Sequence, residues 1–80
     1  MKMYALVKNR ILELCAEKNM TINKLATEAG LSPSSLKSIF YGKSKNPGVV
    51  TLKIICDGLG VSITEFFDTD EFRNAEQEIQ

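Results

Sequence analysis

Apolar residues recur every three or four positions along most of the chain, a spacing that predicts amphipathic helices and no strand. The first such stretch runs from about Tyr4 to Lys18, and its inner face is expected to hold Val7, Ile11, Leu14 and Cys15. A second, shorter helix is predicted over residues 22–29. Thr21 is suited to cap its start, and Gly30 can adopt the left-handed conformation that ends it.

A third helix is predicted over residues 33–40, because Ser32 is a good N-cap and proline is tolerated at the first helical position. Its inward positions are Leu36, Ile39 and Phe40. The opposite side forms a polar outer stripe, which comprises Pro33, Ser34, Lys37, Ser38 and Tyr41.

The loop Lys43-Ser44-Lys45-Asn46-Pro47-Gly48 separates this helix from a fourth, at about residues 50–59, and Ser62 begins a fifth at 63–67. These elements predict an all-α fold, a compact five-helix domain over residues 1–68. Residues 69–80 are acidic but carry Phe72, Ala75 and Ile79 at near-helical spacing. This segment is expected to be either a short sixth helix or a frayed tail.

Length and composition exclude several classes of protein. The 80 residues suffice for one domain, and no apolar run is long enough to cross a membrane. The chain has no histidine, and its two cysteines, Cys15 and Cys56, lie far apart on apolar faces, where core packing is expected. We therefore expect no metal site, no cofactor and no enzymatic activity, and a cytoplasmic location.

The neutral total charge conceals a separation along the chain. Residues 1–53 carry nine basic and three acidic residues, a net charge of +6, whereas residues 54–80 carry one basic and seven acidic residues, a net charge of −6. This asymmetry predicts a basic working face with an acidic back or tail, the alternative being a chance segregation of surface charge.

Two short helices joined by a glycine-containing turn, the second exposing small polar groups, form an arrangement that fits the DNA major groove. Small side chains at Ser34 and Ser38 permit close approach to base edges, and Lys43 and Lys45 can reach phosphates. On pattern alone, a plain helical bundle explains the same spacing.

The segment from Thr21 to Ile39 resembles the phage-repressor/Cro-type, or XRE, helix-turn-helix family. The resemblance covers roughly residues 4–68 and continues through Gly42-Lys43, Asn46-Pro47, Thr51-Leu52 and Leu59-Gly60-Val61-Ser62. It implies a five-helix domain whose third helix reads bases in a double-stranded operator. We therefore expect a homodimeric transcriptional regulator that acts as a repressor.

Carried over position by position, the resemblance assigns base-facing roles to Pro33, Ser34, Lys37 and Ser38. It assigns contacts with the DNA backbone to Thr21, Asn23, Tyr41, Lys43 and Lys45. Many members of the family have glutamine where this chain has Ile22 and Pro33. Isoleucine and proline cannot make those hydrogen bonds. Recognition therefore relies on DNA shape and water, has low specificity, or has been replaced by binding to a protein.

The apolar residues near the C-terminus are expected to form a dimer interface composed of Ile63, Phe66, Phe67 and Phe72, although packing within one chain explains them equally well. The acidic stretch from Asp68 to Glu78 supports an alternative function, an antitoxin-like module that binds a protein partner.

Overall fold

The computed structural model describes residues 2–41 and 47–75, and within these ranges all regular secondary structure is helical. The helices are α1 (Met3–Glu17), α2 (Ile22–Ala29), α3 (Pro33–Phe40), α4 (Val49–Leu59), α5 (Ile63–Phe67) and α6 (Asp70–Arg73). The all-α prediction is thus confirmed, and the first part of the C-terminal segment forms a short sixth helix. None of the helices in these ranges is long and apolar enough to cross a membrane.

The helix boundaries follow from local capping interactions. The hydroxyls of Thr21, Ser32 and Ser62 accept hydrogen bonds from the backbone N–H three residues later, at 3.0, 3.2 and 3.0 Å. α2 and α4 end at Gly30 and Gly60, which have φ angles of +72° and +75°. This left-handed conformation is strained for residues with a side chain, so glycine ends both helices.

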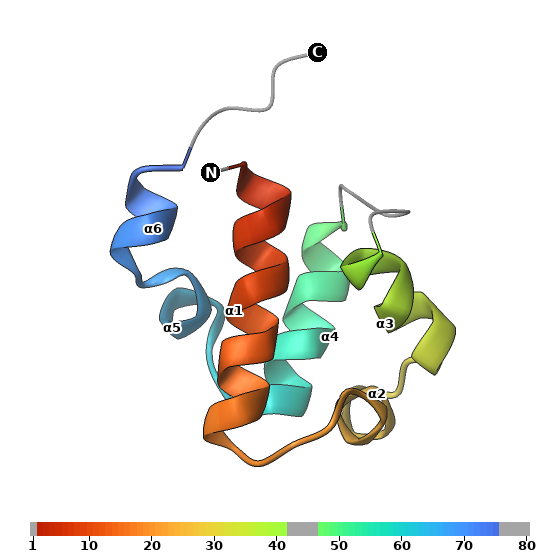
Figure 1. Cartoon of the computed structure of the whole chain (residues 1–80). Helices are drawn as coiled ribbons and strands as arrows, with labels where there is room; N and C mark the ends of the chain where they lie inside the picture. The colour runs from red at the N-terminus through yellow and green to blue at the C-terminus, as the bar shows by residue number, and fades with distance from the viewer. Residues whose placement is uncertain (1, 42–46, 76–80) are drawn as a thin grey trace.

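The six helices are arranged around α1 and α4, which lie at the centre of the molecule. α2 and α3 lie on one side of this pair, and α5 and α6 lie on the other (Figure 1). α2 packs against both α3 and α4, whereas α6 contacts α1. α2 and α4 approach closely at Gly58, where an added Cβ would lie 3.0 Å from the Cβ of Ala29.

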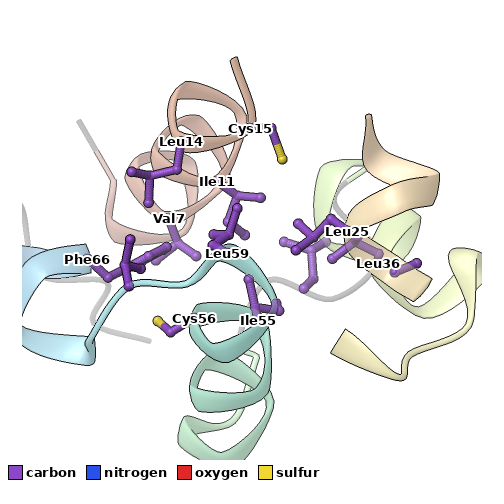
Figure 2. Close-up of a cluster of buried hydrophobic side chains, with 13 residues drawn as sticks. Val7, Ile11, Leu14, Cys15, Leu25, Leu36, Ile55, Cys56, Leu59 and Phe66 are labelled. Carbon is purple, nitrogen blue, oxygen red and sulfur yellow. The ribbon is translucent and has the colours of Figure 1, made fainter. Parts of the chain in front are cut away.

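Every helix from α1 to α5 contributes to one apolar core (Figure 2). The seven bulkiest of its most deeply buried side chains are Ile11, Leu25, Leu36, Ile55, Cys56, Leu59 and Phe66. Cys15 and Cys56 are both buried as free thiols, and burial raises the pKa of each. The prediction that the cysteines serve core packing is therefore confirmed.

The structure corrects the expected role of Phe66. Its side chain is fully buried within its own chain, so it offers no surface to a second copy. Phe67 and Phe72, which are half-buried, contact each other and Phe66, with ring centroids 4.8 to 6.0 Å apart. Of the two adjacent aromatic rings of α5, Phe66 enters the core, to which α1 and α4 also contribute. The acidic and apolar residues at 76–80 lie outside the described residues.

Candidate nucleic-acid interface

α3 separates apolar and polar side chains onto opposite faces. Leu36 and Ile39 are buried in the core and fix the rotation of the helix about its axis. Pro33, Ser34 and Lys37 are consequently exposed, and Ser38 is half-buried. The four residues predicted to face bases therefore occupy the outer side of α3.

The hydroxyl groups at the start of α3 form a local hydrogen-bond network. Ser32 Oγ lies 2.8 Å from Ser35 Oγ and 3.3 Å from Ser34 Oγ. One turn later, Ser38 Oγ donates to the backbone oxygen of Ser34 at 3.0 Å. Ser38 thus retains acceptor capacity toward a base, whereas its hydrogen is already used within the helix.

The residues predicted to contact the DNA backbone lie at both ends of the α2–α3 unit. Thr21 and Asn23 are exposed at the start of α2, and Tyr41 is 75% exposed immediately after α3. Thr21 accepts a hydrogen bond from the backbone of Lys24, and its own hydroxyl hydrogen has no acceptor among the described residues. Lys43 and Lys45 lie outside the described residues, and their phosphate contacts remain predictions.

An open groove of about 300 Å³ connects these ends, and we call it the α1–α3 groove. It is lined by Lys8, Leu12, Ile22, Lys37, Phe40 and Tyr41. The groove brings Lys37 and Tyr41, both predicted from the sequence, next to Ile22 at the start of α2. Lys8 and Leu12 of α1 also line the groove, and the sequence analysis did not assign them to a site. Leu12 is an apolar residue out of phase with the buried positions of α1, and this was the one sign in the sequence that it would be exposed.

Some basic residues between α1 and α4 form ion pairs with neighbouring carboxylates, and others do not. Lys24 pairs with Glu28 at 2.9 Å, which raises the pKa of the lysine and lowers that of the glutamate through their hydrogen bond. Lys53 pairs with Asp57 one turn along α4, and this hydrogen bond raises the pKa of the lysine. Lys8, Lys18 and Lys37, by contrast, form no ion pair with any described residue.

Arg10 does not belong to the basic face that the charge pattern predicted. It pairs with Glu13, and its guanidinium donates to the backbone oxygens of Phe66 at 2.8 Å and Glu65 at 2.9 Å. The charge is therefore directed toward the end of α5, on the side of α1 away from α3 (Figure 1).

The described ranges contain no cluster of acidic and cysteine residues that could hold a metal ion. α3 is instead anchored in the core by its apolar face, and the capped helix α2 and a tight turn precede it. Small polar side chains and the cation of Lys37 lie on the outer face of α3. This geometry defines a helix-turn-helix DNA-binding domain.

Comparison with known proteins identifies the family. The profile of the Cro/C1-type HTH DNA-binding domain matches residues 10–71, and the chain belongs to this family. The family is defined by DNA binding and not by catalysis, which confirms the expectation that the chain is not an enzyme. The match also favours the DNA-binding prediction over the antitoxin-like alternative.

Two individual proteins illustrate the relationship. The HTH-type transcriptional regulator SlrR of Bacillus subtilis (strain 168) is 42% identical over 62 residues, which cover 76% of this chain and 41% of that protein. The chain thus matches less than half the length of this relative. The crystal structure of the prophage Lp1 protein 11 superposes with a TM-score of 0.81 at 37% identity, covering 94% of this chain and 100% of that one.

Proposed function

We propose that the protein is a transcriptional regulator, acting as a repressor, that inserts α3 into the major groove of an operator. The observation that carries this proposal is the orientation of α3. Leu36 and Ile39 hold it in the core while Pro33, Ser34 and Lys37 point outward. The major groove, about 12 Å wide, admits one helix, and small residues allow its backbone to approach the bases.

Within this proposal, the outer residues of α3 differ in what they can read. Lys37 is the longest donor and can reach guanine acceptors, whereas Ser34 and Ser38 offer oxygen atoms at short range. Pro33 has no hydrogen-bonding group and can contact a thymine methyl. With a single long donor on α3, sequence-dependent DNA shape contributes a large share of the specificity.

The proposal includes a homodimer. A domain with a longest dimension of 33 Å covers about one half-site, because half-sites in two-fold operators lie about 34–36 Å apart. Pairing two copies therefore roughly doubles the contact with DNA. The half-buried residues Ile63, Phe67 and Phe72 are the proposed contact, on the side of α1 opposite to α3 (Figure 1).

Selection of bound sequences from random duplex DNA tests the proposal. The wild-type protein is expected to enrich a motif with two-fold symmetry, and Lys37→Ala is expected to relax base preference at particular positions. The expected cost is about 1–3 kcal/mol for the preferred sequence. Lys53→Ala is the matched control, since Lys53 is an exposed lysine already paired with Asp57. Enrichment of no motif by the wild-type protein would contradict sequence-specific binding.

A further inference from the structure

The α1–α3 groove combines an apolar floor with a cationic rim. Ile22 and Phe40 are half-buried beneath it, and Leu12, 44% exposed, forms the wall on α1. These side chains cannot donate a hydrogen bond to a phosphate. Exposed apolar groups gathered in a concave surface are typical of sites that bind other proteins.

The cations at the rim determine the charge of a complementary occupant. Lys8 lies on the α1 side and Lys37 on the α3 side, and neither forms an ion pair with a described residue. Elsewhere in the described helices Lys24 and Lys53 are neutralised by carboxylates one turn away. An occupant with apolar side chains flanked by acidic ones would pack its apolar groups on the floor and pair its carboxylates with the lysines of the rim.

We propose that the α1–α3 groove binds an acidic amphipathic helix of a regulatory protein partner. Such a helix presents apolar side chains at intervals of three and four, which fit the floor, and its carboxylates pair with Lys8 and Lys37. Tyr41, 75% exposed at the end of the groove, offers the large amphipathic surface that often dominates binding energy.

Occupation of the groove has a regulatory consequence that rests on the proposed function. Lys37 and Tyr41 belong both to the groove and to the proposed DNA surface. A helix seated there places carboxylates where phosphates and bases would approach. The partner and the operator therefore exclude one another, and the partner releases the regulator from DNA.

A library of random peptides of about 15 residues, roughly four helical turns, displayed on phage provides the probe. Selection on the full chain is expected to enrich acidic amphipathic sequences, and one enriched peptide is then synthesised with a fluorescent label. Leu12→Ser and Lys8→Glu are each expected to weaken its binding by about tenfold or more. Lys18→Glu is the control and is expected to leave binding nearly unchanged, because Lys18 is an exposed lysine at the C-cap of α1, without an ion pair to a described residue and outside the groove.

Three results would overturn the docking site. The first is enrichment of no peptides, or only of basic ones. The second is equal binding to wild type and Leu12→Ser, with circular dichroism showing that the variant is folded. The third is conversion of a wild-type dimer to a monomer by Leu12→Ser, which would make a second copy of the chain the occupant.

Competition with duplex DNA tests the regulatory step separately. The labelled peptide is expected to be displaced by the selected duplex from wild-type protein, and Leu12→Ser is expected to bind that duplex normally without responding to peptide. A ternary complex of protein, peptide and duplex would contradict mutual exclusion. Peptide binding by a protein that binds no duplex would instead refute the proposed function and leave the docking site intact.

Discussion

At the scale of single residues, Arg10 connects helices that are distant in sequence. Its Nε atom donates to the Phe66 oxygen and its Nη2 atom to the Glu65 oxygen, while Nη1 pairs with Glu13. The last carbonyls of a helix lack partners within the helix and carry partial negative charge. The Arg10 side chain, which is 13% exposed, donates hydrogen bonds to two of these carbonyl oxygens and places a positive charge beside them.

Replacement of Arg10 by alanine is expected to lower the free energy of unfolding by about 1.5–3 kcal/mol, the usual range for hydrogen bonds to a charged group. Arg10→Lys should recover only part of this loss, because an ammonium group cannot form the same planar fork. Urea unfolding followed by circular dichroism measures both effects. Full stability in Arg10→Ala would show that these contacts contribute nothing net.

Sequence reasoning missed this role of Arg10 because its partners lie 55 and 56 positions away. A charge pattern records the sign of a side chain and not the direction in which the fold turns it. The same limitation explains why Phe66 was expected at a dimer interface although it is buried in the core of its own chain. The sequence showed an excess of aromatic residues near the C-terminus, but the orientation of α5 decided which ring entered the core.

At the scale of helices, the contact between α2 and α4 depends on the absence of a side chain at Gly58. An alanine there would bring its Cβ to 3.0 Å from the Cβ of Ala29 and to 3.1 Å from the Cα and N atoms of that residue. Backbone atoms cannot move aside as a flexible side chain can. The two helices must therefore separate to accommodate the substitution.

Gly58→Ala is thus expected to lower the melting temperature, although alanine favours a helix over glycine by about 1 kcal/mol. Adding Ala29→Gly should restore part of the lost stability, because it removes the Cβ atom of Ala29, the nearest of the three atoms that the new side chain meets. Thermal unfolding of the single and double variants measures the coupling. A Gly58→Ala protein more stable than wild type would refute the proposed close contact.

The orientation of α3 can be tested through stability alone. Leu36→Ala removes a fully buried side chain and is expected to cost about 2–5 kcal/mol. Lys37→Ala changes an exposed neighbour and should alter stability by about 0.5 kcal/mol or less. Denaturant unfolding compares them, and similar costs for both variants would mean that α3 is rotated differently.

The secondary structure was largely predictable because its determinants are local. The bounds of α2, α3 and α5 agree with prediction, since Thr21, Ser32 and Ser62 cap their own helices. The polar outer stripe of α3 followed from the helical period, and the structure places it on the exposed side of the helix. The α1–α3 groove could not be predicted in this way, because Lys8 and Leu12 come to line one groove with Ile22 only in the folded chain.

At the scale of the whole molecule, the prediction to be tested is that two copies of the chain form a dimer through Ile63, Phe67 and Phe72. Sedimentation at concentrations on the order of tens of micromolar is expected to show a dimer, and Phe67→Asp is expected to yield a monomer with weak operator binding. Circular dichroism is the control, since Phe67 also contacts Phe66 and Phe72 within the chain. A monomeric wild-type protein would refute the dimer without affecting the role of α3.

The central claim is that α3 enters the major groove, and chemical-shift mapping tests it most directly. Isotope-labelled protein is titrated with the selected duplex, and the backbone amide of each residue is followed by nuclear magnetic resonance. The largest shifts are expected at Ser34, Lys37 and Ser38, with smaller shifts at Thr21 and Asn23 and little change along the outer surface of α6. Shifts concentrated on α5 and α6, with α3 unchanged, would contradict the account.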